Sequence, residues 1–259
     1  MSGIKRLFYD LETSPNIMYS WRAGYKLNLS HESIIQERAI ICACYKWEHC
    51  DKIYSIRWED GDDKSLVEKF SKIAEHADEL VAHNGDRFDL KWFNTRHLLH
   101  GLPPIPQYKT VDTLKIAKKH FYLNSNRLDY LGRVLFGEGK IHTTFDLWKD
   151  VCAGDKRAMN QMVRYCKKDV ELLQRVWEKL SAYDTPKTHA GVFGGGDRWT
   201  CPHCGSEEVH LSKTRPTPKG MIQRQMLCND CCRYYTIANS VYNQYREKKE
   251  ASCLRSQKN

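Results

Sequence analysis

The segment Ile4–Leu11 constrains the fold of this chain more than any other, because its aromatic and branched apolar residues predict a buried strand. Two acidic residues, Asp10 and Glu12, stand at its end. Side chains two positions apart in a strand project from the same face, so both carboxylates lie together. Buried like charges repel one another unless a cation neutralises them. The pair therefore indicates a divalent metal site, although such a pair is also common on solvated surfaces.

Downstream patterns predict an α/β protein with a mixed sheet. The segment 14–37 is polar and irregular, which favours a loop or a small insertion. Apolar runs predict strands at 39–47, 52–58, 79–84 and 110–114. Amphipathic patterns predict helices at 64–76, with the acidic stretch 59–63 as its cap, and at 88–100, 114–121, 128–136 and 156–180, the last with a break near Cys166.

Asn84 and Asp89 stand where a predicted strand turns into a helix, which is where sites collect in open α/β sheets. Asp89 falls in the first turn of that helix. A structural interpretation is also open, because an aspartate at this position stabilises a helix through capping and the helix dipole.

Tyr165 and Asp169 are four residues apart at the start of a long amphipathic segment. This spacing places them on one helix face, one turn apart. By themselves they are also consistent with a solvated aspartate beside a half-buried tyrosine.

Taken in order, the three motifs D-x-E, N-x-x-x-F-D and Y-x-x-x-D resemble the DEDDy branch of the DEDD 3′–5′ exonucleases. The chain is most similar in pattern to the proofreading exonuclease domain of family B DNA polymerases. The segment Arg127–Lys140, which ends in Gly-Glu-Gly-Lys, resembles the corresponding segment of that family. The resemblance covers about residues 4–180.

This resemblance implies an RNase H-like fold with a mixed five-stranded sheet flanked by helices. It implies two Mg²⁺ or Mn²⁺ ions bound by the acidic residues of the motifs, and oxygen ligands suit these ions. Two such ions stabilise the attacking and leaving oxygens in phosphodiester hydrolysis. Tyr165 is expected to position the attacking water, because a phenol with a pKa of about 10 is a poor base at neutral pH. Asn84 is expected to contact the terminal nucleotide or to orient the site. The metal ligands and catalytic acids implied are Asp10, Glu12, Asp89 and Asp169.

Asp112 stands at the end of the strand predicted at 110–114. It is either a carboxylate that supports the metal ligands or, as we favour, the N-cap of the helix that begins near Leu114.

Two C-x-x-C pairs near the C-terminus predict a zinc ribbon. The expected ligands are Cys201, Cys204, Cys228 and Cys231, with the adjacent His203 and Cys232 as alternatives. The predicted strands of the ribbon are 209–212, 223–227 and 233–237. A module of this size depends on its metal for folding.

The intervening hairpin carries Lys213, Arg215 and Arg224 near aromatic residues, a combination suited to phosphate contact and base stacking. Ribbons also bind proteins, so a replication or repair partner is the alternative. The predicted organisation is an exonuclease domain at 1–184, a linker at 185–197, the ribbon at 198–240 and a charged, disordered tail at 241–259.

The chain has a net charge of +9, of which residues 181–259 carry +5, and a basic balance suits a nucleic-acid partner. There is no apolar run of membrane-spanning length and no secretory signal near the N-terminus, so we expect a cytoplasmic protein with reduced thiols. No polymerase domain follows the motifs, which favours a free-standing exonuclease or a subunit.

The sequence favours a metal-dependent 3′–5′ exonuclease acting on single-stranded DNA. An RNA-trimming exonuclease is an alternative with the same chemistry. A catalytically silent nucleic-acid-binding adaptor is a further alternative, against which the complete set of four acids argues.

Overall fold

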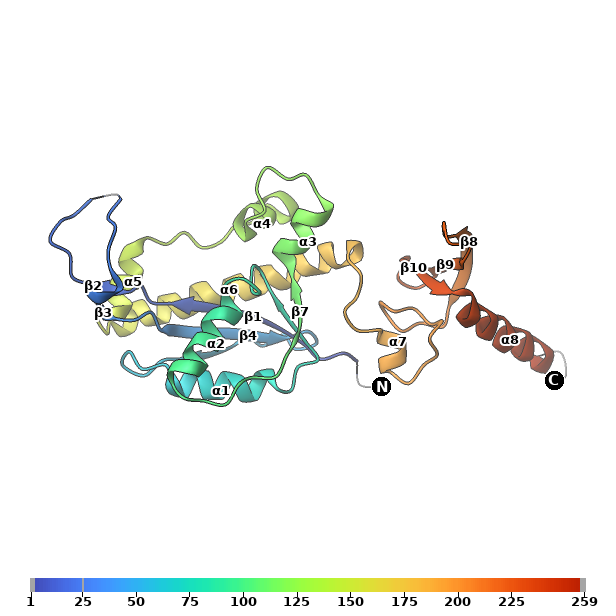
Figure 1. Cartoon of the computed structure of the whole chain (residues 1–259), viewed down its shortest axis with the longest axis horizontal. Coiled ribbons are helices and arrows are strands. Elements are labelled where there is room, and N and C mark those ends of the chain that lie inside the picture. The colour runs from blue at the N-terminus through green and yellow to red at the C-terminus, as the bar shows by residue number, and fades with distance from the viewer. Residues whose placement is uncertain (1–2, 25, 257–259) are drawn as a thin grey trace. The chain divides into compact units, whose positions relative to one another are not determined.

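The computed structural model describes residues 3–24 and 26–256. The chain forms two compact units, one of residues Lys5–Asp184 and one that contains the chain from Thr185 onward (Figure 1). We refer to them as the large unit and the C-terminal unit. None of the helices in the described residues combines the length and the apolar character that a membrane crossing requires.

The large unit is built on a mixed five-stranded sheet in the order β5-β4-β1-β6-β7. β1 pairs antiparallel with β4 and parallel with β6, while β4–β5 is antiparallel and β6–β7 is parallel. The central position of β1 explains its continuous apolar character, because both of its faces are covered. The strands are β1 (Arg6–Thr13), β4 (Ile40–Trp47), β5 (Tyr54–Arg57), β6 (Glu79–Ala82) and β7 (Lys109–Asp112). The predicted mixed five-stranded sheet is thus confirmed.

Helices cover the two faces of this sheet (Figure 1). On one face, α1 and α2 pack on Leu7, Tyr9 and Leu11 through aromatic residues such as Phe70. On the other face, α6 packs on Phe8 and on the cysteines of β4. The helices are α1 (Lys64–Ala74), α2 (Asp89–Leu99), α3 (Thr113–His120), α4 (Leu128–Phe136), α5 (Phe145–Cys152) and α6 (Lys156–Leu180). A short 3-10 turn, η2 (Ser181–Tyr183), follows α6.

Two helices of the large unit differ from the sequence prediction. α6 runs without the break expected near Cys166, because that thiol is buried in the apolar face of a continuous helix. α5 is absent from the prediction, since the helix is short and buries only Leu147 and Val151 fully. The loop 14–37 contains the small pair β2 (Ile17–Met18) and β3 (Ile34–Gln36), joined through a 3-10 turn, η1 (His31–Ser33).

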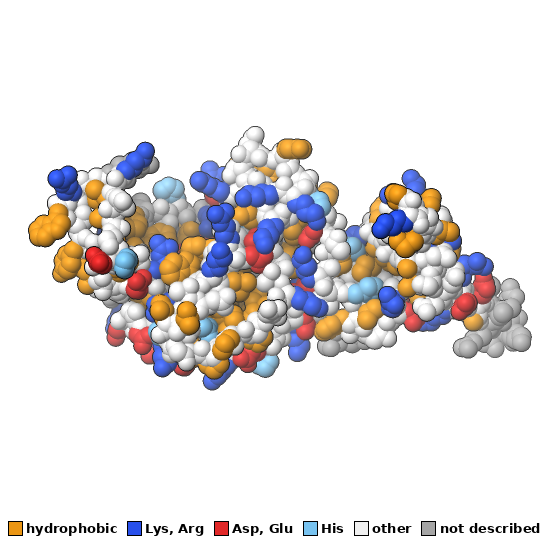
Figure 2. All heavy atoms as spheres, in the orientation of Figure 1, with side chains coloured by type: hydrophobic (Ala, Val, Ile, Leu, Met, Phe, Trp, Pro, Cys, Tyr) orange, Lys and Arg blue, Asp and Glu red, His pale blue; other side chains and the backbone are white. Residues whose placement is uncertain are grey.

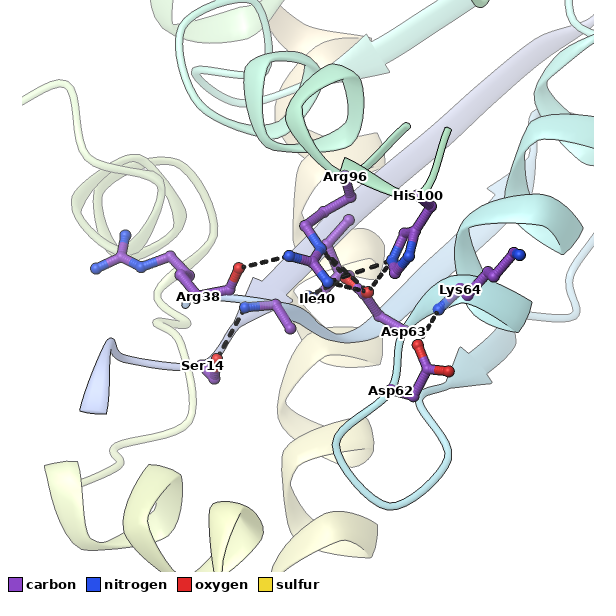
Figure 3. Close-up of polar contacts among 9 residues, drawn as sticks. Ser14, Arg38, Ile40, Asp62, Asp63, Lys64, Arg96 and His100 are labelled. Atoms are coloured by element: carbon purple, nitrogen blue, oxygen red, sulfur yellow. Dashed lines mark hydrogen bonds and ion pairs between the residues drawn. The ribbon is translucent and has the colours of Figure 1, made fainter. Parts of the chain in front are cut away.

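The acidic stretch before α1 acts differently from the cap that the sequence predicts (Figure 3). Asp62 Oδ1 accepts a hydrogen bond from Lys64 N at 2.9 Å, but Asp63, at the N-cap position, makes no side-chain capping bond. Instead the buried Asp63 carboxylate accepts from Ile40 N at 2.8 Å and pairs with Arg96 and His100 of the α2 end. The start of β4 is thereby tied to α1 and α2.

The C-terminal unit contains a three-stranded antiparallel sheet in the order β10-β9-β8. Its core is formed by Trp199, Val209, Met226, Ile237 and Val241 together with two of the cysteines. The elements are α7 (Ala190–Phe193), β8 (Val209–Pro216), β9 (Ile222–Cys228), β10 (Tyr234–Ala238) and α8 (Asn239–Ser256).

The segment 185–197 is not a free linker in this structure. Gly191 of α7 is buried, and an added Cβ there would lie 1.8 Å from Thr200 Oγ1. Ala190 N also donates a hydrogen bond to Pro202 O at 3.0 Å. The glycine-rich composition that suggests a linker instead allows close packing against the first cysteine pair.

The charged segment predicted to be disordered at 241–259 forms most of α8, up to Ser256; residues 257–259 lie outside the described chain. Its charges pair along the helix and with neighbouring loops, as in Arg246 with Glu250 and Lys248 with Asp197. Val241 is buried, and Tyr245 donates to Val209 O at 2.9 Å. The charged composition of the segment does not show that a few of its side chains, such as Val241 and Tyr245, attach one face of the helix to the sheet.

Candidate active site

Three carboxylates from distant parts of the chain converge at the end of β1. Asp10 and Glu12 lie on the face of β1 that α6 covers, opposite Cys44 and Cys42 in the antiparallel register. Asp169 reaches the same place from α6, and one oxygen of each of the three carboxylates lies within 4.8 Å of the other two. The structure therefore brings together three of the four acids predicted as metal ligands.

The fourth predicted acid, Asp89 of the N-x-x-x-F-D motif, lies beside this group. It is buried in the first turn of α2, and its Oδ1 accepts a hydrogen bond from Leu11 N at 3.0 Å. Leu11 is the residue between Asp10 and Glu12, so Asp89 is bound to the strand that carries them. Its carboxylate is not one of the three within 4.8 Å of each other.

Burial of these carboxylates raises their pKa values. Burial and then Glu12 raise the pKa of Asp10, while burial raises the pKa of Glu12 to about 8 even though Lys140 lowers it. Burial likewise raises the pKa of Asp89 to about 7 against the hydrogen bond from Leu11. The pKa of Asp169 is raised in the same way against the influence of Lys140. In the absence of a cation, burial therefore favours the protonated, neutral forms of these carboxyl groups.

Lys140 is a member of the site that the sequence reasoning does not assign. Its ammonium group pairs with Asp169 and donates a hydrogen bond to Tyr165 Oη at 3.0 Å. Although burial opposes its charge, the carboxylates of Asp169 and Asp10 raise the pKa of Lys140 above its usual value. The family resemblance includes the segment that ends in Gly-Glu-Gly-Lys, so Lys140 is part of the pattern. A lysine that follows a glycine-rich turn between two acidic motifs is the sequence signal that could have identified it.

Tyr165 lies one turn before Asp169 on α6, as the spacing predicts. Its ring stacks edge-on with Trp148 at a centroid distance of 6.1 Å and lies under the Lys140 ammonium at 5.1 Å. Burial and the negative charge of Asp169 raise the pKa of Tyr165 above the usual 10.0. The phenol therefore stays protonated at neutral pH and can donate a hydrogen bond, but it cannot act as a base.

Asn84 has a left-handed backbone, with φ 67°, at the turn after β6. Its backbone N donates to Asp112 Oδ1 at 2.8 Å, and the same oxygen accepts from Leu114 N at 3.0 Å. Asp112 is thus the N-cap of α3, which confirms the structural interpretation of that residue. The contact of Asn84 with a substrate stays a prediction.

The site fits divalent cations by its own chemistry. All of the converging ligands are carboxylate oxygens, which suit Mg²⁺ or Mn²⁺. Both oxygens of Asp169 are buried, and the carboxylate faces Lys140 and Tyr165, of which Lys140 is the cation that pairs with it. Buried anionic oxygens of this kind are stabilised by a metal ion.

Comparison with protein families identifies the fold. Residues 32–181 match the model of the RNase H superfamily, which is more than half of the chain. The chain belongs to the RNase H superfamily. Asp10 and Glu12 precede the matched residues, so their place in the site rests on the geometry described above. A comparison with curated protein sequences gave no match.

Solved structures also resemble the chain, with 176 chains matched. One is the family B DNA polymerase from the hyperthermophilic archaeon Pyrobaculum calidifontis, with a TM-score of 0.55 and 15% identity. The match covers 70% of this chain and 25% of the polymerase chain. At this identity the likeness shows the fold alone, and the matched part of the chain spans only a quarter of the length of the polymerase.

A second candidate metal centre lies in the C-terminal unit, outside the residues that the family model matches. The Sγ atoms of the two C-x-x-C pairs lie within 4.8 Å of one another, with Cys201–Cys231 and Cys204–Cys228 each at 3.6 Å. The two alternative ligands are not in this group: His203 Nδ1 lies 3.2 Å from Arg233 Nη1, and Cys232 Sγ lies 3.8 Å from Asn229 O. The arrangement is compatible with a tetrahedral four-thiolate site.

The basic residues predicted to bind substrate on the hairpin differ in their surroundings. Lys213 and Arg215 are exposed on β8. Arg224 of β9 donates to Thr214 Oγ1 and Asn239 Oδ1 and stacks on the Tyr242 ring at 4.8 Å. Its guanidinium therefore holds the hairpin to the start of α8, which leaves Lys213 and Arg215 as the more available cations.

Proposed function

We propose that this chain is a metal-dependent 3′–5′ exonuclease of the DEDDy type. Membership of the RNase H superfamily and the likeness to a polymerase fold support a nuclease-type function. The observation that carries the finer assignment is the convergence of Asp10, Glu12 and Asp169, with Asp89 bound to the same strand. A set of buried carboxylates with raised pKa values and a protonated tyrosine suits two-metal phosphodiester hydrolysis.

In this proposal, Asp10, Glu12, Asp89 and Asp169 hold two Mg²⁺ or Mn²⁺ ions, which stabilise the charge of the attacking and leaving oxygens. Tyr165 donates a hydrogen bond that orients the attacking water. Lys140 holds the Tyr165 hydroxyl and the Asp169 carboxylate in place and adds positive charge beside the reacting phosphate.

Single-stranded DNA is the substrate that we favour, and RNA is the alternative. Basic side chains support a nucleic-acid substrate: Figure 2 shows Lys and Arg gathered on the visible face of the large unit, around α3 and α4. The last turns of these helices carry Lys118, Lys119 and Arg133. Positive charge around an acidic site draws in a polyanion while the metal ions neutralise the acids.

In the C-terminal unit, we propose that Cys201, Cys204, Cys228 and Cys231 bind one structural Zn²⁺. The proximity of the four Sγ atoms supports this, and the three-stranded sheet supports the description as a zinc ribbon. Lys213 and Arg215 would then contact the phosphates of the substrate strand. A replication or repair protein is the alternative partner of this surface.

A cleavage assay tests the proposed activity. DNA and RNA oligonucleotides of the same sequence, labelled at the 5′ end, are incubated with Mg²⁺, Mn²⁺ or EDTA and resolved on a gel. We expect a ladder that shortens from the 3′ end in the presence of a divalent ion and no cleavage in EDTA. Loss of label as a mononucleotide at the earliest times would instead indicate the 5′–3′ direction and contradict the proposal.

Asp169→Asn should lower the cleavage rate by at least about 100-fold, because it removes one anionic metal ligand. Asp150→Asn on the exposed side of α5 is the matched control and should cleave as the unaltered chain does. Undiminished cleavage by purified Asp169→Asn protein would reject the metal-site assignment.

A further inference from the structure

A cavity of about 380 Å³ opens directly beside the candidate active site. Thr13, the residue after Glu12, lines one side of it, and Thr144, Phe145 and Trp148 line another, a few residues after Lys140. Trp148 also stacks on the Tyr165 ring. The cavity is therefore continuous with the two segments that supply the site, and its volume is within the range of small-ligand pockets, about 300–1,000 Å³.

Arg38 supplies the positive charge of this cavity. Among residues 3–24 and 26–256, no carboxylate forms an ion pair with it, and its buried Nε has no hydrogen-bond partner. Its guanidinium is held over the Trp92 ring at 5.0 Å. Because the described chain supplies no anion to this half-buried guanidinium, it is available to pair with the phosphate of a ligand.

The backbone of Arg38 is fixed on both sides. Its N donates to Asn16 Oδ1 at 2.9 Å, and its O accepts from Arg96 Nη1 at 3.3 Å. Arg96 is in turn held by two 2.7 Å contacts to the fully buried carboxylate of Asp63. Figure 3 shows the Arg38 guanidinium pointing away from this cluster. The network thus fixes the position of Arg38 while no carboxylate of the described chain pairs with its charge.

Aromatic surface lies across the same cavity. Phe145 is 62% exposed, and Trp148, one turn later in α5, is partly buried. Single-stranded nucleic acid is bound by combining a cation for the phosphate with an aromatic face for the base. The cavity presents both.

We infer that this cavity binds one nucleotide of a single-stranded nucleic acid, with the Arg38 guanidinium on its phosphate and the base against Phe145. This inference rests on the proposed function for its choice of ligand, and it specifies how the strand is held beside the metal site. The charge arrangement favours it, because the carboxylates of the site repel a phosphate and Arg38 offers the compensating attraction nearby.

A binding experiment with the full chain tests the inference without cleavage. The probe is a fluorescent thymidine oligodeoxynucleotide of about six nucleotides, short enough to occupy few sites. Its affinity is measured by fluorescence anisotropy in EDTA over a series of salt concentrations. Arg38→Gln should weaken binding about tenfold and should reduce the slope of log affinity against log salt by about 0.7, the value for one phosphate contact on a single strand.

Four further variants, two of them controls, separate charge, geometry and stacking. Lys72→Gln removes one exposed charge from α1 and should leave both affinity and slope unchanged. Arg38→Lys should keep most of the slope but bind less tightly, because an ammonium group lacks the planar fork. Phe145→Ala should bind about tenfold more weakly with an unchanged slope, while Leu98→Ala, which truncates an exposed residue of α2, should have no effect.

Cleavage of the same oligonucleotide with Mn²⁺ distinguishes this inference from the proposed function. If Arg38→Gln and Phe145→Ala bind as tightly as the unaltered chain, the inference is wrong even where cleavage is observed. If the unaltered chain does not cleave but the two variants lose affinity as described, the cavity binds nucleic acid and the exonuclease proposal is wrong.

Discussion

At the level of single residues, the burial of acidic side chains determines the protonation of the site. Glu12 and Asp89 have pKa values raised to about 8 and about 7, because burial disfavours their charged forms. Lys140 partly offsets the charge of the site through its pair with Asp169. Carboxyl groups that are protonated at neutral pH in the absence of metal release their protons when a divalent ion binds.

The stability of the metal-free protein should therefore fall as the pH rises from about 5 to about 8. The folded state keeps protons on Glu12 and Asp89 that the unfolded chain has lost, so folding is favoured at the lower pH. Melting temperatures measured in EDTA across this range should show the fall, and Glu12→Gln should show a smaller one. Mn²⁺ should raise the melting temperature more at pH 8 than at pH 5. An equal pH dependence in Glu12→Gln would contradict the assignment.

Tyr165→Phe should keep metal and strand binding but lower the cleavage rate by about 10–100-fold. Only the hydroxyl that contacts Lys140 is removed, and a positioning hydrogen bond contributes less than a general base. Single-turnover cleavage and Mn²⁺ binding measured on the same preparation check this. Because the tyrosine is protonated throughout the neutral range, the pH profile of cleavage should keep its shape. If Tyr165→Phe instead abolished a rise of the cleavage rate with pH, the phenol would be acting as a base.

At the level of elements, α6 organises the site. Its apolar face packs on β1 and β4, and Tyr165 and Asp169 project from the same helix. Cys166, between them, lies with its Sγ 3.4 Å from Asp10 O, so helix and strand meet at a thiol small enough to allow this approach. The position of Asp169 relative to Asp10 therefore depends on packing along the whole helix.

Gly132→Ala should destabilise the large unit through the contact of α4 with α6. A Cβ at Gly132 would lie 2.5 Å from Glu138 O and 2.9 Å from the Leu172 methyl groups. Overpacking of this kind costs about 1–3 kcal/mol in the free energy of unfolding. Urea denaturation measures the change, and Val134→Ala, at an exposed position of the same helix, is the control. Equal midpoints for Gly132→Ala and the unaltered chain would show that the two helices separate without cost.

At the level of the whole molecule, charge and architecture divide the chain into two units of different character. The large unit holds all of the proposed catalytic acids, and the C-terminal unit holds the four-cysteine group. Residues 181–259 carry +5 of the net charge of +9 on less than a third of the chain. Substrate binding and cleavage can then be separated by truncation.

A chain ending after Asp184 should fold and cleave but bind nucleic acid more weakly. It keeps the sheet, the acids and the Asp184 pair with Lys119, and it loses Lys213 and Arg215. The salt dependence of affinity should become shallower, since fewer phosphate contacts release fewer counterions. Zinc content should fall from about one ion per chain to none.

Two results would count against this view of the C-terminal unit. Affinity and salt slope that match those of the full chain would identify the ribbon surface as a protein-binding one. An insoluble truncated chain would show that the large unit requires the rest of the chain to fold.

Local patterns in the sequence are enough to predict much of this protein. Residue spacing within an element determines which side chains share a face, so spacing alone places Asp10 beside Glu12 and Tyr165 beside Asp169. Strong amphipathic periodicity likewise predicts α4 and the bounds of α6. The two C-x-x-C pairs predict a four-cysteine group for the same local reason.

The tertiary structure decided everything that depends on contacts between segments far apart in the sequence. Lys140 reaches the site only because the loop after α4 returns to α6, and Arg38 faces a cavity only because Asp63 and Arg96 fix its backbone. The packing of 185–197 and the ordered start of α8 arise from buried anchors such as Gly191 and Val241 in a polar context. Composition and periodicity report the average character of a segment, whereas these positions are set by single contacts whose partners lie elsewhere in the chain.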